Sequence, residues 1–279
     1  MQSAQLFVSY GAWLRRLAAP LVAGLMVLWS APVTANQSSP APDLEREQRL
    51  KDQIVDGILD GEPVMMTGAD AHEFLAIYTE AEEQAKGTVI VMHGRGMHPD
   101  WSDVVGPIRV GLTEHGWNTL SIQMPVLEKG RKYFDYVSIF PASYPRIEAA
   151  IAYAREQGAE KVVALAHSCS VHMSMAYVRD KGHARLDAYI GVGMGATDYG
   201  QPMREPFPLA NMTLPVLDIF GADEYHSVKK DAPARKASLT ANNPNSRQVV
   251  VKEAEHYFKD KGDELTGAVA AWLADIIWE

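Results

Sequence analysis

The sequence predicts an α/β fold in which a mainly parallel central sheet is flanked by helices. Six short runs are rich in β-branched and apolar residues, and most are apolar throughout, which is typical of strands buried on both faces. Helix-like segments lie between most of these runs, which favours parallel crossover connections over hairpins. The six runs are 87–94, 118–125, 161–168, 186–195, 214–223 and 247–256.

The first 35 residues have the pattern of an export signal. Two adjacent arginines precede the apolar run 17–29, and Val33 and Ala35 occupy the small-residue positions before a cleavage point. The run is short for a membrane span and Pro20 interrupts it, so we expect cleavage after Ala35 rather than a retained anchor. The mature chain would then be periplasmic or secreted without membrane insertion, through the general or the twin-arginine route.

Composition limits the remaining possibilities. The chain has 279 residues, 47% of them hydrophobic, which is enough for one sizeable core. Without the first 35 residues it has 24 basic and 35 acidic residues, a net charge of −11, which argues against nucleic-acid or anionic-lipid partners. Cys169 is the single cysteine, so no internal disulfide can form and the core must hold the fold together.

Three shorter segments complete the expected organisation. The segment 36–61 is expected to be a polar linker followed by an amphipathic helix with Leu50, Ile54 and Ile58 on one stripe. The main domain, 62–279, begins with two strand-like runs around a turn at 68–70, which indicates a hairpin. It ends with an amphipathic helix, 263–279, expected to cover the sheet.

The segment Ala-His-Ser-Cys-Ser, residues 166–170, lies where a strand-like run changes to a helix-like pattern. A nucleophile at a sharp strand-to-helix turn needs small residues two positions before and after it. Ser168 meets this demand, with Ala166 and Ser170 as neighbours, whereas Cys169 and Ser170 have bulky flanks. The alternative is that Ser168 caps the helix.

A serine nucleophile needs a histidine base and an acid that orients it. Asp223 follows one buried strand and His256 follows the next, which gives the order Ser, acid, His. Asp198 is a second candidate for the acid and His226 for the base.

The turn His93-Gly94-Arg95-Gly96 follows the first central strand and can supply backbone N–H donors for an oxyanion. The backbone N–H groups of Arg95 and Cys169 are the expected donors, with Gly96 as the alternative to Arg95. We expect no metal, since His93 and His98 lack a third ligand at convincing spacing, and no cofactor. Two further sets of residues are assigned to substrate binding: His93, Gly94, Gly96 and His167 near the turn, and Tyr133, Phe134 and Tyr136 on an aromatic loop.

From about Glu62 to its C-terminus the chain resembles the α/β-hydrolase superfamily, and within it a secreted bacterial family of unknown function. The motifs that carry the resemblance are HGRG, AHSCS, GADE and AEHYF, in that order. The resemblance implies a triad of Ser168, Asp223 and His256, with the N–H groups of Arg95 and Cys169 as the oxyanion hole.

The loops at the strand ends bear on the substrate. Residues 196–213 are too few for a helical lid, so we expect no large lid. The aromatic residues of the loop 126–145 either wall a substrate pocket or pack the loop onto the body. The expected function is an exported serine hydrolase that cleaves an ester or related acyl bond of a small-molecule or acyl substrate. An acyltransferase with the same triad and a non-catalytic envelope binding protein are the alternatives, and the sequence indicates no oligomeric state.

Overall fold

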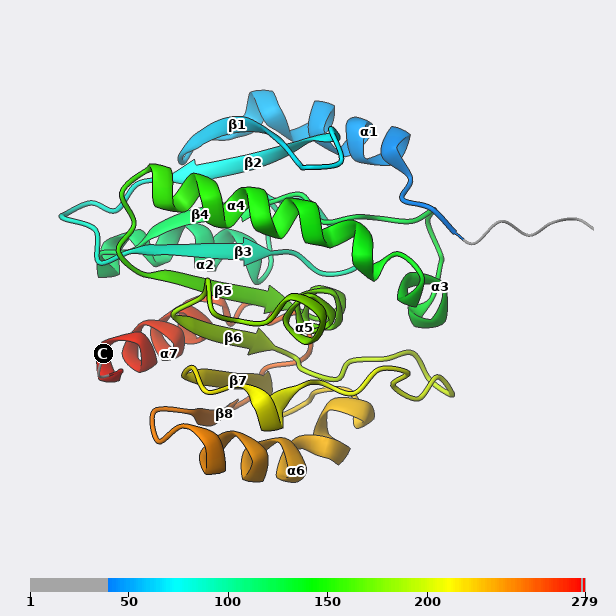
Figure 1. Cartoon of the computed structure of the whole chain (residues 1–279), viewed down its shortest axis with the longest axis vertical. Helices are drawn as coiled ribbons and strands as arrows, with labels where there is room; N and C mark the ends of the chain where they lie inside the picture. Colours follow the sequence, from blue (N-terminus) through cyan, green and yellow to red (C-terminus); the bar gives the residue numbers. More distant parts are fainter. Residues whose placement is uncertain (1–39, 277, 279) are drawn as a thin grey trace, which may run out of the picture. The chain divides into compact units, whose positions relative to one another are not determined.

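An eight-stranded sheet forms the centre of the structure, a computed structural model that describes residues 40–276 and 278 (Figure 1). The strand order is β1-β2-β4-β3-β5-β6-β7-β8. β1 pairs with β2 and β2 with β4 antiparallel, and every other pair is parallel, so the expected mainly parallel sheet is confirmed. The strands are β1 Glu62–Thr67, β2 Glu73–Thr79, β3 Thr88–Met92, β4 Asn118–Ile122, β5 Val162–His167, β6 Ala188–Val192, β7 Val216–Gly221 and β8 Arg247–Val251. The predicted export signal and its cleavage point after Ala35 lie outside the described residues.

Helices cover both faces of this sheet, which explains why its central strands are apolar throughout. In β3, Ile90 and Met92 pack into one core cluster and Val89 and Val91 into the other, since successive side chains point to opposite faces. One face is covered by α4 and α5 and the other by α2 and α7, while α6 packs against β7 and β8 (Figure 1). The helices are α1 Leu44–Ile54, α2 Val105–Gly111, α3 Tyr133–Val137, α4 Tyr144–Glu156, α5 Cys169–Lys181, α6 His226–Asn242 and α7 Gly262–Asp275, with short 3-10 turns η1 Val55–Gly57, η2 Thr113–His115, η3 Phe140–Ser143 and η4 Leu209–Asn211.

The expected hairpin and C-terminal helix are both present. β1 and β2 are joined by a turn in which Gly68 N–H donates to His72 O at 3.0 Å. In α7, Leu265, Val269 and Trp272 are buried against the sheet. Among the helices of the described residues, none combines the length and the apolar character that a membrane crossing requires.

The N-terminal helix differs from the expectation. α1 ends at Ile54, one 3-10 turn follows, and Ile58 is extended, because Gly57 is a poor helix former. Leu50, Ile54 and Ile58 are only half-buried, so the expected apolar stripe does not attach this helix to the body.

Polar contacts attach α1 instead. Asp43 N–H donates to Val126 O at 2.8 Å, and the buried Glu47 carboxylate pairs with the buried Arg146 guanidinium at 2.8 Å. Arg46 donates to Gly96 O at 3.1 Å and to Leu127 O, so α1 contacts the loops that follow β3 and β4.

The Glu47–Arg146 pair gives a stability prediction. Glu47→Ala leaves the Arg146 charge buried without its partner, which typically costs about 3 to 5 kcal/mol. We expect a loss of about 3 kcal/mol or more in the free energy of unfolding, measured by urea denaturation followed by circular dichroism. Glu45→Ala, which removes an exposed ion pair on the same helix, is the control and should leave the transition unchanged. Equal destabilisation by both changes would contradict the prediction.

Candidate active site

Ser168 lies at the sharp turn between β5 and α5. Its backbone has φ 56° and ψ −114°, an unusual conformation for a residue with a side chain. The flanking Ala166 and Ser170 are buried, and Ser170 Oγ donates to His93 O. The Ser168 side chain makes no capping hydrogen bond to α5, so the helix-cap alternative is not what the structure contains.

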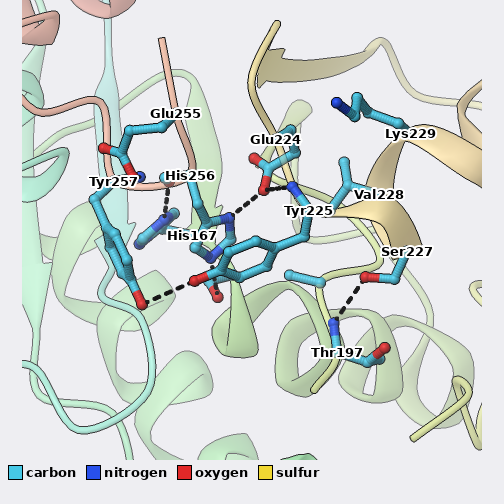
Figure 2. A network of polar contacts seen from close by, with 12 residues as sticks. His167, Thr197, Glu224, Tyr225, Ser227, Val228, Lys229, Glu255, His256 and Tyr257 are labelled. Atoms are coloured by element: carbon cyan, nitrogen blue, oxygen red, sulfur yellow. Dashed lines mark hydrogen bonds and ion pairs between the residues drawn. The ribbon is translucent and has the colours of Figure 1, made fainter. Parts of the chain in front are cut away.

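His256 follows β8 and joins Ser168 to an acid. Its Nε2 lies 2.8 Å from Ser168 Oγ. Its Nδ1 lies 2.6 Å from Glu224 Oε1, a contact drawn in Figure 2. A carboxylate only accepts, so Nδ1 carries the proton and Nε2 is free to accept from the Ser168 hydroxyl. The three side chains follow the carboxyl ends of β5, β7 and β8. Because β5 to β8 are parallel neighbours, these ends lie at one edge of the sheet.

The acid is Glu224, which corrects the expectation of Asp223. Asp223 is exposed and its backbone N–H bonds to Ala254 O at 2.9 Å, whereas Glu224 is buried and also accepts from Tyr225 N–H at 2.8 Å. The turn after β7 points these adjacent carboxylates in different directions, and only Glu224 reaches His256. The sequence signal was present in the GADE motif, but the direction of each side chain depends on the turn.

The two other candidates are not part of this triad. Asp198 pairs with Arg95 through contacts of 2.5 and 3.1 Å and accepts from Tyr133 N–H at 2.7 Å. Burial alone would raise the pKa of Asp198, but the hydrogen bonds from Arg95 and Tyr133 hold it below its ordinary value. His226 is the first residue of α6, and the histidine that contacts Ser168 is His256.

The expected oxyanion donors lie beside Ser168. Arg95 and Cys169 line the same cavity as Ser168. Within residues 40–276, no acceptor takes a hydrogen bond from the backbone N–H of either residue. Both N–H groups therefore belong to residues of the Ser168 cavity and are available to bind an oxyanion. The Cys169 thiol is buried, which raises its pKa to about 12, so it is a protonated packing residue.

Two buried histidines, His93 and His167, hold the backbone around the site through hydrogen bonds. Burial lowers the pKa of both His93 and His167 to about 3, so both rings are neutral. His167 Nε2–H donates to His256 O at 3.1 Å and so holds the loop that carries the base. His93 Nδ1–H donates to Gly94 O at 2.8 Å, and its Nε2 accepts from Met124 N–H at 2.9 Å.

A cavity of about 680 Å³ opens at Ser168 and His256. The expected substrate contacts His93, Gly94, Gly96 and His167 are not among the lining residues, which corrects those assignments. Gly94 approaches the His167 ring too closely for a side chain, and the Gly96 carbonyl accepts from Arg46. The lining residues are Arg95, Met97, Tyr133, Ser168, Cys169, the loop 195–203, 225–227, Lys230, Asp231, His256 and Tyr257.

Of the expected aromatic residues, only Tyr133 lines the cavity. Tyr136 is buried, its hydroxyl accepts from Leu127 N–H at 3.0 Å, and burial raises its pKa to about 12. The Arg204 guanidinium lies over the Phe134 ring, with its Cζ 4.0 Å from the ring centroid. The aromatic loop therefore mainly packs onto the body, as the alternative interpretation held.

Among residues 40–276 no large lid covers the cavity, as expected. Between β6 and β7 the chain forms only the 3-10 turn η4. Within the described part of the chain, no group of three or more His, Cys, Asp or Glu side chains is arranged to hold a metal ion.

Residues 19–133 and 142–275 match the family described as Protein of unknown function (DUF3530), and the chain belongs to that family. No protein with a curated description matches the sequence.

Solved structures share the fold at low identity. An α-β serine hydrolase homologue from Coxiella burnetii is 15% identical, with a TM-score of 0.56, over 77% of this chain and 98% of that one. The Pyrococcus furiosus esterase Pf2001 is 15% identical, with a TM-score of 0.60, over 78% of this chain and 92% of that one.

A third similar structure is XC6422 from Xanthomonas campestris, described as a serine hydrolase without lid. It is 15% identical, with a TM-score of 0.56, over 78% of this chain and 95% of that one. Together with the sheet order, these likenesses establish the α/β-hydrolase fold for this chain.

Gly193, after β6, gives a prediction about the geometry of the site. It has φ +68°, and a Cβ there would lie 3.0 Å from His256 Cε1 and 3.3 Å from Glu224 Oε2. Gly193→Ala should therefore displace the His256–Glu224 pair and slow fluorophosphonate labelling of Ser168 by roughly 100-fold, as misplacement by about 1 Å can do.

The control is Gly158→Ala, which has φ +82° but no atom within 4 Å of the new Cβ. It should lose stability through backbone strain and keep the labelling rate. Equal labelling of the two variants, both confirmed as folded by circular dichroism, would contradict the prediction.

Proposed function

We propose that this protein is a serine hydrolase that cleaves an ester or a related acyl bond. The observation that carries the proposal is the continuous hydrogen-bonded series from Glu224 through His256 to Ser168 at the mouth of a cavity. A surface serine that is not catalytic has no need of a buried carboxylate–imidazole pair aligned on its hydroxyl. The similar structures described as esterases and serine hydrolases share this fold, and they support the reaction class by analogy only.

The chemistry follows from the geometry. Ser168 Oγ attacks the carbonyl carbon of the substrate while its proton passes to His256 Nε2. The N–H groups of Arg95 and Cys169 stabilise the tetrahedral oxyanion, and Glu224 stabilises the imidazolium. His256 then gives the proton to the leaving oxygen, the carbon–oxygen bond breaks, and the acyl group remains on Ser168. Water, deprotonated by His256, attacks the acyl carbon. The bond between that carbon and Ser168 Oγ then breaks, His256 returns the proton to Oγ, and the carboxylic acid leaves.

Hydrolysis is favoured over acyl transfer because the described residues place no lid over the cavity that would exclude water. Its size suits a substrate of the dimensions of a small drug.

A purely binding role is the second class of function. It would be supported by a serine out of reach of its base, and here the Oγ–Nε2 distance is 2.8 Å. The proposal includes export and cleavage after Ala35, for which the support is the N-terminal sequence pattern.

Ser168 gives the direct test. The purified chain starting at Asn36 should react with a fluorescent fluorophosphonate, with the label on Ser168. Ser168→Ala should lose the label, and ester turnover should fall by up to about 10⁶-fold, as in a dissected serine-protease triad. Ser138→Ala, which removes an exposed hydroxyl on another loop, is the control and should react like the wild type. A folded wild-type protein without label would favour the binding role.

The identity of the acid gives a second test. Glu224→Gln keeps the size of the side chain but removes the charge that stabilises the imidazolium. It should slow ester hydrolysis by about 10³- to 10⁴-fold, as loss of the triad acid does elsewhere. Asp223→Asn changes the neighbouring carboxylate, which is exposed, and should stay within about 2-fold of the wild type. The reverse result in steady-state kcat would return the role to Asp223.

A further inference from the structure

Two tyrosines enclose the imidazole of His256. The Tyr225 ring is stacked on it, with centroids 4.2 Å apart and planes 24° apart. The Tyr257 ring stands nearly perpendicular to it, with centroids 5.0 Å apart and planes 76° apart. Figure 2 shows Tyr225 lying across the face of His256, with Tyr257 beside it. Both tyrosines also line the cavity, and the His256 side chain that they contact is buried.

The stacked position of Tyr225 is fixed at both ends. Its backbone N–H donates to Glu224 Oε1 at 2.8 Å, the same oxygen that accepts from His256 Nδ1. Its hydroxyl donates to Tyr257 Oη at 3.2 Å, and Tyr257 N–H in turn donates to Glu255 Oε2 at 3.0 Å. Although Tyr225 is 42% exposed, these contacts hold its ring in place.

The face of an aromatic ring is electron-rich and attracts a cation within about 6 Å of its centroid. During the reaction His256 gains a positive charge when it takes the Ser168 proton. The stack therefore favours the charged ring over the neutral ring, in the same direction as the Glu224 carboxylate. An interaction that strengthens as charge develops lowers the barrier.

We propose that Tyr225 is a positioning residue that stabilises the imidazolium form of His256 through its ring face. The inference rests on the proposed function, because its consequence is a more reactive Ser168. It assigns a purpose to a half-exposed tyrosine that the triad itself does not need.

The other groups around His256 belong to other residues and remain when Tyr225 is replaced, although Tyr257 loses its hydrogen bond from the Tyr225 hydroxyl. Glu224 and Ser168 bond its two nitrogens, and His167, 5.1 Å away, is neutral through burial. Tyr257 remains beside the ring. The other charged side chains or histidines of the cavity are Arg95, which is paired with Asp198, and His226, Lys230 and Asp231 from the first turns of α6. The remaining titratable groups that line it are Tyr133, Cys169 and Tyr199. A difference between variants at position 225 therefore reports the ring at that position.

The experiment is the pH dependence of fluorophosphonate labelling in the wild type, Tyr225→Leu and Tyr225→Phe. Labelling needs neutral His256, so the rate falls as the pH drops through the midpoint of the acid limb. In Tyr225→Leu the apolar cover remains but the ring face is lost. The midpoint should move to lower pH by about 0.4 to 1 unit, and the plateau rate should fall by up to about 10-fold.

Two controls isolate the ring face. Tyr225→Phe keeps the ring and loses only the hydroxyl bond, so its midpoint should remain near that of the wild type. Tyr199→Leu removes a fully exposed tyrosine from the same cavity, away from the ring contacts of His256, and should leave the midpoint unmoved. Tyr225→Met serves as a second non-aromatic variant if Tyr225→Leu fails to fold.

Ring-carbon NMR of His256, identified by the signal lost in His256→Gln, measures the same midpoint without any reaction. If the wild type does not label, the proposed function fails, and the NMR midpoints of the wild type and Tyr225→Leu still decide the role of Tyr225. If the wild type labels but the Tyr225→Leu midpoint stays or moves to higher pH, this inference is overturned and the proposed function stands.

Discussion

The strained turn at Ser168 is the constraint on which the candidate active site depends. A φ of 56° at a residue with a side chain is unfavourable by about 1 to 3 kcal/mol and persists only where the surroundings determine it. Here β5 is buried on both faces, α5 begins at the next residue, and small side chains at Ala166 and Ser170 let the two elements approach closely. Because of this turn, the Ser168 hydroxyl lies beyond the end of β5, in the cavity that Cys169 also lines.

The remaining parts of the site are brought to this turn by parallel strand order. Because β5, β6, β7 and β8 are neighbours, the loops after β7 and β8 end beside Ser168. Neutral, buried histidines then join the loops through hydrogen bonds. His167 holds the carbonyl of His256, and His93 connects the loop after β3 with the backbone after β4. A charged imidazolium in either buried place would be unfavourable, and the lowered pKa values reflect this.

Charged contacts at the rim hold the outer loops in a similar way. Arg95 pairs with Asp198, so the loop that supplies an N–H donor is fixed to the loop after β6. From the other side, Arg46 of α1 holds the Gly96 carbonyl. The N-terminal helix thus supports the loop next to Ser168. The Arg95 side chain and the adjacent Gly96 carbonyl are both held by these contacts.

The sequence by itself determined the sheet, the turn and two of the three residues in the hydrogen-bonded series of Ser168, His256 and Glu224. Strands buried on both faces consist of continuous apolar runs and can therefore be identified from the sequence. Ser168 can be identified because the small residues that its turn requires are only two positions away on either side. The tertiary structure decided the rest. Choosing Glu224 over the adjacent Asp223, stacking Tyr225 on His256, and turning Phe134 and Tyr136 away from the cavity all depend on side-chain directions after a strand has ended. Those directions are set by loop geometry and by packing partners distant in sequence, which no local pattern records.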